Sequence, residues 1–471
     1  MANVFVEEDS LKAIGAAIRE TGGTAGLLKP AEMAEAVRKL GGIQPEGSLR
    51  AVPYKSAGQL RAPAESGRFV SLYPEFSQFT QRWSSTSFDA DCFDAVRLDG
   101  RRVFLAYANT QGDRWLYCCV LTVYPFGYHV GDIVRAAASV TGPCISAAAL
   151  DGDRVLVTYA GEGGVDACVV TVNGNGVENI SDAATILSGS LQWFEAGAAG
   201  QNSAEIFYRE QTGYPAMVRV AVGTDGQVST VYDSGGGWSG GVYMSAYERP
   251  ILFSLGDLGV LAVYNHSDTL VCRLDWSSGF GYSEGAVQGI GSGSGVPLAG
   301  TRLADGRFFI VYARGDNTHG AVLRVDYDND ISSSGLRVTV EGYDLNLMDL
   351  YSAQQAIAAT LEDGRVLVLA HVYYAAYWTA VIAQIDVSET MGVTVTAELH
   401  DTGWYTENGD LKRLLRLPGG DVAILGMNGS DIGLLQNEYY ASLFHGMNCG
   451  LVKTTGGDGD TIEVYVPVVE L

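Results

Sequence analysis

The sequence predicts an all-β fold: a seven-bladed β-propeller of four-stranded antiparallel blades, preceded by a small N-terminal helical hairpin. An apolar pattern recurs seven times at spacings of 48 to 58 residues, as LDGRRVFLAYA at 98–108 and LDGDRVLVTYA at 150–160. Gly is abundant, with 60 of 471 residues, whereas charged residues make up only 18%. Short strands joined by Gly-containing turns have this composition, and disordered chains do not.

The repeat itself determines the architecture that we expect. Its other copies lie at 199–209, 255–265, 303–313, 361–371 and 417–427. Leu occupies the first position in six copies and Tyr the tenth in five. A repeat of this length is one supersecondary unit that cannot bury its own apolar face, so the copies must pack around shared cores.

Each unit follows one order of strands and turns. In the first unit, strand a at 93–98 meets an Asp-Gly turn, the strongest short hairpin signal, and strand b follows at 103–107. A polar loop leads to strand c at 116–123, and a second turn leads to a less apolar strand d. Four such strands make a propeller blade. Tandem β-sandwich domains are the alternative, but they predict pairs of sheets and no seven-fold register.

The seventh unit lacks a fourth strand. It has strands a and b at 411–417 and 422–425 and a strand c near 439–444. The segment 68–80 leads into a Trp-Ser pair, as strand d does in other units, so we expect it to supply the missing outer strand and close the ring. The propeller then spans 68–446, and 447–471 form a separate C-terminal β-hairpin.

Residues 1–42 predict a helical hairpin, with helices at 11–20 and 30–40, and 43–67 predict a linker that contains Pro, Gly and Ser. Two helices of this length are marginal alone, so they must pack on a partner. The apolar residues that we expect to dock are Leu11, Ile14, Ile18, Met33, Val37 and Leu40.

The net charge and the cysteines limit which partners and which cellular compartment we expect. The net charge of −24 argues against nucleic acid and anionic lipid as partners. Seven Cys without a CxxC pair predict buried free thiols and synthesis in a reducing cytoplasm. The first ten residues do not resemble a signal peptide. The apolar stretch 366–383 is long enough for a membrane span, but the repeat places it in two strands, so we expect no membrane insertion.

Known catalytic and metal-binding motifs are broken or out of context. The calcium-loop start at 326–330 has Ile331 and Arg337 where that loop requires Gly and Glu, so we assign it to the c–d turn. The GWSGG string at 237–241 lacks the helix that a nucleophile elbow needs. We therefore predict no catalytic residue, no metal and no cofactor. Glycosidase carboxylate pairs have no fixed spacing, so an enzyme stays an open alternative.

Two kinds of loop residue are candidates for ligand binding. Trp83, Trp193, Trp238 and Trp404 recur before strand a, which favours a role in filling gaps between blades. Residues of the b–c loops do not recur, and aromatic rings beside amides or carboxylates can stack on sugars and bond to their hydroxyls. For these residues ligand recognition and a purely structural role both stay open. The candidates are Asn109, Tyr214, His266, Arg314, Asp316, Tyr373, Tyr374 and Tyr377, with Asp113, Arg209 and Asn428 in the same loops.

The N-terminal segment LKAIGAAIRETGGTAGLLKPAEMAEAVRKL at 11–40 resembles a short helical module that begins tail and other virion-structure proteins of bacteriophages. Lys29 departs from that pattern, where the family often has a Thr cap. The ending GDGDTIEVYVP at 457–467 is similar to the ends of phage fibre and decoration proteins. The residues that match the N-terminal pattern are Ile14, Ala17, Ile18, Arg19, Thr21, Gly22, Leu28, Pro30, Glu32, Met33, Ala34, Ala36 and Val37.

The resemblance implies a phage virion protein, a tail fibre or receptor-binding adhesin. Residues 1–42 would attach to other virion proteins, and the propeller would display its loops to a bacterial surface receptor, with a glycan the expected ligand. Fibres of this kind are often trimers, although the chain has no coiled-coil heptads. A propeller glycan hydrolase or depolymerase and a purely architectural baseplate or capsid decoration protein are the alternatives.

Overall fold

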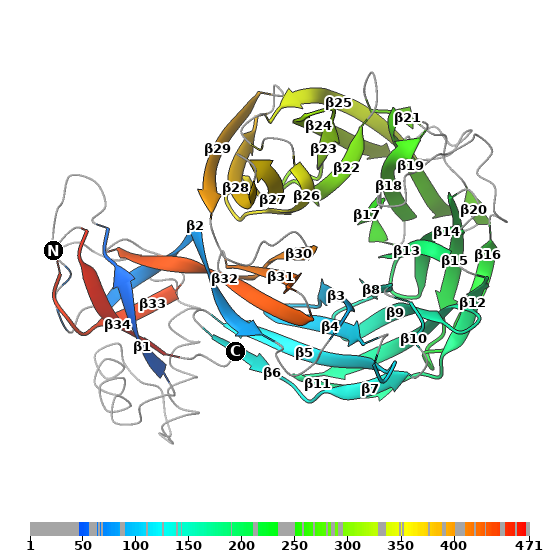
Figure 1. Ribbon diagram of the computed structural model, residues 1–471, viewed down its shortest axis with the longest axis horizontal. Coiled ribbons are helices and arrows are strands. Elements are labelled where there is room, and N and C mark those ends of the chain that lie inside the picture. The colour runs from blue at the N-terminus through cyan, green and yellow to red at the C-terminus, as the bar shows by residue number, and fades with distance from the viewer. Residues whose placement is uncertain are drawn as a thin grey trace, which may run out of the picture. The chain divides into compact units, whose positions relative to one another are not determined.

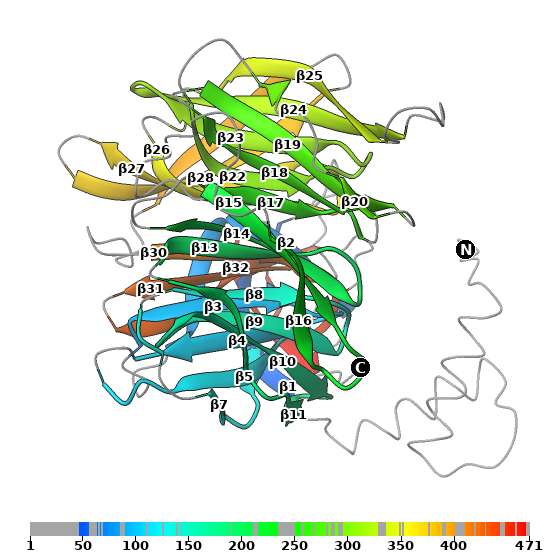
Figure 2. The same cartoon turned by 90° about the vertical axis from the view of Figure 1, so that its right-hand side faces the viewer.

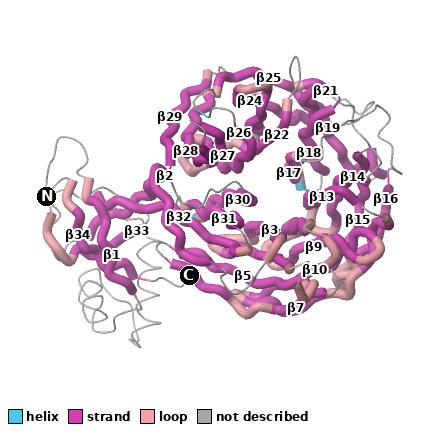
Figure 3. The backbone as a smooth tube through the Cα atoms, viewed as in Figure 1, coloured by secondary structure: helices cyan, strands magenta, loops and turns pink. Residues whose placement is uncertain are grey.

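A computed structural model describes residues 47–467, apart from short segments within that range, of which the longest are 56–63, 234–249, 328–335 and 401–409. Strands dominate the described chain (Figure 3). The chain divides into two compact units, one of residues 74–438 and one of residues 1–73 with 439–471. The helical hairpin expected at 1–42, with all six of its predicted docking residues, lies outside the described residues.

The larger unit is a ring of sheets, and each of its first three blades follows the order a, b, c, d (Figure 1). Blade one has β3 (Cys92–Arg97), β4 (Arg102–Ala108), β5 (Leu116–Tyr124) and β6 (Gly127–Val130), with β7 (Val134–Ala137) also on β5. Blade two has β8 (Ile145–Ala149), β9 (Arg154–Gly161), β10 (Gly164–Asn173) and β11 (Gly176–Ile180), with β12 (Ala184–Ser188) also on β10. Blade three has β13 (Leu191–Ala198), β14 (Ser203–Glu210), β15 (Pro215–Val222) and β16 (Val228–Asp233).

Blades four to six repeat this order. Blade four has β17 (Ile251–Ser254), β18 (Gly259–His266), β19 (Thr269–Ser278) and β20 (Gly281–Ser283), with β21 (Gln288–Gly289) also on β19. Blade five has β22 (Val296–Arg302), β23 (Phe308–Arg314), β24 (Asn317–Tyr327) and β25 (Leu336–Asn346). Blade six has β26 (Ala353–Thr360), β27 (Val366–Tyr374), β28 (Tyr377–Val387) and β29 (Val393–His400).

Blade seven closes the ring with a strand from the other end of the chain. Its strands are β30 (Asp410–Arg416), β31 (Val422–Asn428), β32 (Asp431–Ser442) and β2 (Phe69–Ser84). The outer strand β2 includes the segment expected to supply it. The predicted seven-bladed propeller is therefore confirmed. The stretch 366–383 lies in β27 and β28 as expected. The apparent calcium loop begins in the last two residues of β24, and its other residues lie outside the described part of the chain.

Apolar clusters fill the gaps between successive blades. Such clusters join blades one and two, two and three, three and four, and so on around the ring. One of them joins blade seven to blade one, through Leu425 and Leu434 on one side and Phe93 and Leu105 on the other. Because each blade buries both of its faces, the repeat unit needs both neighbours, as its length predicts.

The recurring Tyr belongs to these clusters. Tyr107, Tyr159, Tyr208, Tyr264 and Tyr312 are all at most 3% exposed. Each packs in the gap between its own blade and the preceding one. The hydroxyl of Tyr208 donates to Asp233 at 3.2 Å and that of Tyr312 to Asp344 at 2.7 Å, so the ring fills a gap while its polar end bonds to strand d.

Two of the recurring Trp also pack between blades. Trp193 is buried at the start of β13, in the cluster between blades three and four. Trp83 is half-buried against the cluster between blades seven and one. Both support the gap-filling interpretation, whereas Trp238 and Trp404 lie outside the described residues.

The smaller unit contains β1 (Gly47–Pro53), β33 (Asn448–Val452) and β34 (Thr461–Pro467), and β33 and β34 pair antiparallel as a C-terminal hairpin. Strand β1 pairs with β34 along its whole length, from Gly47 opposite Pro467 to Pro53 opposite Thr461. The expectation of a linker over 43–67 is therefore wrong for this stretch. Val52 and Tyr54 are buried while their neighbours are exposed, a two-residue period, and Pro53 is tolerated because β1 is an edge strand.

Candidate functional site

Antiparallel order places the b–c turns and the d–a connections on one face of the ring, which we call the loop face. Figure 2 shows the blades from the side, with their strands crossing between the two faces. Loops held by a rigid scaffold are the usual place for binding residues. The loop face is therefore where we look for a site.

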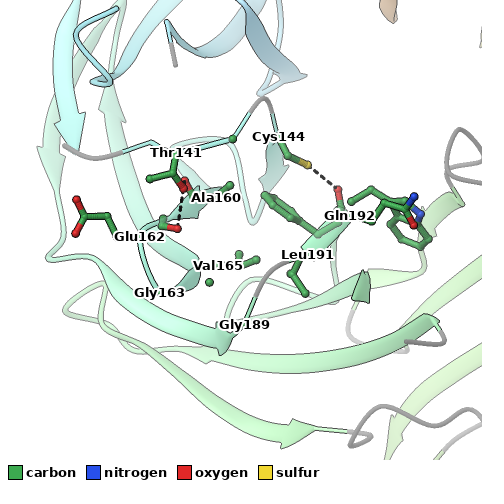
Figure 4. A pocket seen from close by; sticks show the side chains of 14 residues that line it. Thr141, Cys144, Ala160, Glu162, Gly163, Val165, Gly189, Leu191 and Gln192 are labelled. Carbon is green, nitrogen blue, oxygen red and sulfur yellow. Dashed lines mark hydrogen bonds between the residues drawn. The ribbon is translucent and has the colours of Figure 1, made fainter. Parts of the chain in front are cut away.

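A pocket of about 640 Å³ opens on the loop face between blades two and three (Figure 4). Three segments line it: Thr141, Gly142 and Cys144 before β8, 160–165 across the turn from β9 to β10, and Gly189 with 191–194 at the start of β13. We call it the inter-blade pocket. Its size is typical of small-molecule sites, which span roughly 300–1,000 Å³.

The β9–β10 turn, Gly161-Glu162-Gly163-Gly164, requires glycine at its last position. A Cβ on Gly164, whose φ is +149°, would lie 2.0 Å from the carbonyl oxygen of Leu187 on β12. A Cβ on Gly161 would meet only the end of the Asp166 side chain, which can move aside. The turn can approach β12 this closely because Gly164 lacks a side chain.

Hydrogen bonds hold the walls of the inter-blade pocket together. The Thr141 backbone N–H donates to the carbonyl of Ala160 at 2.8 Å, and the Thr141 hydroxyl donates to that of Gly161 at 2.8 Å. The Cys144 thiol lies 3.6 Å from the carbonyl oxygen of Phe194 and donates to it, which connects blade two to blade three. These bonds connect the three segments that line the pocket.

The lining combines an apolar part with a polar part. Val165 and Phe194 are buried and Leu191 is half-buried, whereas Glu162 and Gln192 are exposed at the mouth. None of the fourteen lining residues is Lys, Arg or His. Such a surface can contact an apolar ligand face while its amide and carboxylate oxygens accept hydrogen bonds from hydroxyls.

Three of the eight predicted ligand-binding residues have described side chains, and these three, Asn109, Arg314 and Asp316, do not line the pocket. Asn109 lies in a loop of blade one on the same face. Its side-chain oxygen accepts from the Gly112 backbone N–H at 2.6 Å. The sequence analysis missed the aromatic residues beside it. The Arg135 guanidinium lies 4.5 Å from the centre of the Trp115 ring, and the Tyr117 hydroxyl donates to Asp113.

Arg314 and Asp316 occupy the corresponding turn of blade five, with Asp316 exposed at its tip. One Arg314 nitrogen contacts both carboxylate oxygens of Asp344 at 2.9 and 2.8 Å. Burial opposes ionisation of Asp344, but the hydrogen bond from Tyr312 and the Arg314 charge outweigh it and lower its pKa. Asp344 also has a φ of +51°, so this ion pair holds a strained backbone in place.

The other predicted residues are placed only by their backbone. Tyr374 and Tyr377 are register partners at the β27–β28 turn, with Tyr373 one step before, and His266 pairs with Thr269 at the β18–β19 turn. These turns are b–c turns of blades six and four. The side chains of these four residues, and Tyr214 as a whole, lie outside the described residues.

A local signal in the sequence does mark the inter-blade pocket. The connection at 161–164 has three Gly among four residues, whereas each equivalent connection of the other blades has at most one. A Gly cluster that interrupts a repeat indicates a close backbone approach. The walls contributed by 141–144 and 189–194 have no comparable signal, because only the fold brings them to this turn.

Within the described ranges of 47–467, no group of three or more His, Cys, Asp or Glu residues is placed to hold a metal ion. The same part of the chain contains no helix that is long and apolar enough to cross a membrane.

No family model and no curated protein matches the sequence. Similar solved structures include a protein from Lactobacillus plantarum, 14% identical, covering 78% of this chain and 100% of that one, with a TM-score of 0.46. The Aleuria aurantia lectin bound to α-methyl-L-fucoside is 10% identical, covering 66% of this chain and 95% of that one, with a TM-score of 0.38. The Pseudomonas aeruginosa periplasmic gluconolactonase is 12% identical (85% and 100% covered, TM-score 0.38). With TM-scores below 0.5, none of these likenesses bears on the function of this chain.

Proposed function

We propose that this protein is a carbohydrate-binding propeller of a bacteriophage particle, a tail fibre or receptor-binding adhesin that recognises a glycan on the host surface. The observation that supports binding is the inter-blade pocket, which is preformed, open on the loop face, and lined by both apolar and polar groups. The observation that supports a virion role is the N-terminal resemblance at 11–40.

A sugar is the ligand class that suits this lining. A pyranose presents C–H groups on its faces and hydroxyls around its edge. Leu191, which is half-buried, offers apolar contact, while Thr141, Glu162 and Gln192 offer oxygen atoms that can accept hydroxyl protons. A rigid pocket also costs little conformational entropy on binding, since its walls are already bonded to each other.

An array of bacterial surface glycans, probed with the full chain, tests the binding function. We expect a defined set of glycans to retain the protein, with no release of reducing ends on incubation with host polysaccharide. Silence across glycans from several hosts would contradict the binding function. Release of reducing ends would instead make the protein a glycan hydrolase or depolymerase.

Deletion of residues 1–42 tests the virion role. The described strands begin at Gly47, so the deletion leaves every strand of both units intact. We expect the shortened protein to give the same circular dichroism spectrum and the same glycan binding, but to be absent from purified particles. Incorporation at the level of the full chain would refute docking through this segment.

A further inference from the structure

The charge of the inter-blade pocket suggests which glycans it can accept. We infer that the pocket takes a glycan end that carries no negative charge, a neutral or amino sugar, and that Glu162 excludes uronic and sialic acids. This inference rests on the proposed carbohydrate binding, and it adds the class of sugar and the residue that selects it.

Glu162 dominates the charge at the mouth of the pocket. It lies exposed at the tip of the β9–β10 turn, between Gly161 and Gly163 (Figure 4). Asp166 on β10 is the register partner of Tyr159, which packs toward blade one, and it accepts a hydrogen bond from the Thr185 hydroxyl at 2.6 Å. Glu162 is therefore the one carboxylate among the lining residues.

No cation in the lining offsets the Glu162 charge, because none of the fourteen lining residues is Lys, Arg or His. Arg209, the register partner of the lining residue Trp193, is not itself among them. The net charge of the chain, −24, adds a long-range repulsion toward anionic ligands.

A sugar carboxylate in this pocket would approach Glu162 without a partner for its own charge. Like charges brought together during binding reduce affinity, and salt weakens the effect when they are partly exposed. A neutral sugar avoids this repulsion, and an amino sugar gains an attraction. Added salt should therefore reduce the difference in affinity between acidic and neutral sugars.

Cys144 provides a readout at the pocket itself. It lines the pocket and is half-buried, whereas Cys92, Cys118, Cys119, Cys168 and Cys272 are buried. Burial raises the pKa of Cys119, Cys168 and Cys272 to about 12, which makes these thiols slow to react. Alkylation of Cys144 by a neutral reagent, followed by peptide mass spectrometry, then reports occupancy of the pocket.

The experiment uses the full chain with Cys449→Ser and pairs each neutral methyl glycoside with its uronate: glucoside with glucuronide, and galactoside with galacturonide. We expect the neutral sugar to protect Cys144 from alkylation. Its uronate should need at least about tenfold higher concentration for the same protection at low salt. Glu162→Gln should reduce this ratio of protecting concentrations. Glu178→Gln, an exposed carboxylate on β11, is the matched control and should leave the ratio unchanged.

The outcomes separate this inference from the proposed function. Equal protection by a sugar and its uronate, or an unchanged ratio in Glu162→Gln, would overturn the charge selection while glycan binding stands. Glycan retention on the array without any protection of Cys144 would place the binding elsewhere and also overturn the inference. If no glycan on the array retains the protein and no sugar protects Cys144, the proposed binding function itself is contradicted.

Discussion

Ion pairs between Asp and Arg recur at the a–b turns of four blades. Arg102, Arg154, Arg307 and Arg365 donate through Nε to Asp99, Asp151, Asp305 and Asp363 at 2.7 to 2.8 Å. For Asp151, burial alone would raise the pKa, but bonds from the backbone N–H groups of Asp153 and Arg154 and from the Arg154 guanidinium outweigh it. The pKa values of all four carboxyls are lowered.

These lowered pKa values predict sensitivity to acid. A carboxyl whose pKa is lower in the folded state contributes its full stability above its unfolded pKa, about 3.9, and loses it as the pH falls through the folded value. We expect Asp151→Asn to lower the free energy of unfolding at pH 7 by at most about 1 kcal/mol, because the pair is partly exposed. This difference should shrink below pH 4.

Urea unfolding at neutral and acidic pH measures this effect. Asp132→Asn, at an exposed carboxylate outside the turns, is the matched control and should show no such pH-dependent difference. A destabilisation by Asp151→Asn that persists unchanged at acidic pH would mean that the turn depends on the shape of the side chain and not on its charge.

At the scale of the elements, charged side chains connect the innermost strands of several blades. Nη2 of Arg413 on β30 donates to Asp94 on β3 and to Glu195 on β13, each at 2.8 Å. Asp94 also accepts from the backbone N–H of Ala147 on β8 at 2.9 Å. One network therefore joins blades seven, one, two and three.

The repeat explains how these residues meet. Arg413, Asp94 and Glu195 occupy the same repeat position, four residues before the first residue of the motif. In the other four blades that position holds Ser146, Ile251, Ala299 and Ile357. Equivalent positions lie at the same height on the inner strands, so a cation in blade seven can reach anions of other blades.

Removal of the Arg413 cation should destabilise the ring. Asp94 is 1% exposed and Glu195 is 9% exposed, so Arg413→Ala leaves two buried carboxylates without their counter-charge, a change that typically costs about 3–5 kcal/mol. Arg416→Ala is the control. Its pair with Glu362 is 4.0 Å long and exposed, and is worth about 0–1 kcal/mol. Equal unfolding midpoints for the two variants would contradict a role for this network in closing the ring.

At the scale of the whole chain, much of the ring could be predicted because its signals are local and repeated. The Asp-Gly turns, the alternating strands and the five recurring Tyr each report the same register. Even the outer strand of blade seven could be predicted, because 68–80 continues into a Trp-Ser pair like the one that follows other d strands. The smaller unit was harder, because β1 contains Pro53 and pairs with a strand more than four hundred residues away.

The candidate site was much less predictable than the scaffold. Its walls come from three segments that carry no shared motif, and they meet only when blades two and three pack together. Of the loop residues chosen for their chemistry, Asn109, Arg314 and Asp316 have described side chains, and they lie on the same face but do not line the pocket. Their part in recognition, like docking through the six apolar residues of 1–42, stays a prediction.

The most direct test of carbohydrate binding in the inter-blade pocket is calorimetric titration of the best array glycan into two leucine variants. Gly163→Leu places a side chain at the mouth of the pocket, and Gly289→Leu places one on β21 of blade four; a Cβ at either position has open space around it. We expect Gly163→Leu to weaken binding by at least about tenfold, roughly 1.4 kcal/mol, and Gly289→Leu to leave the affinity unchanged. Undiminished binding by Gly163→Leu would contradict the pocket as the site of glycan recognition.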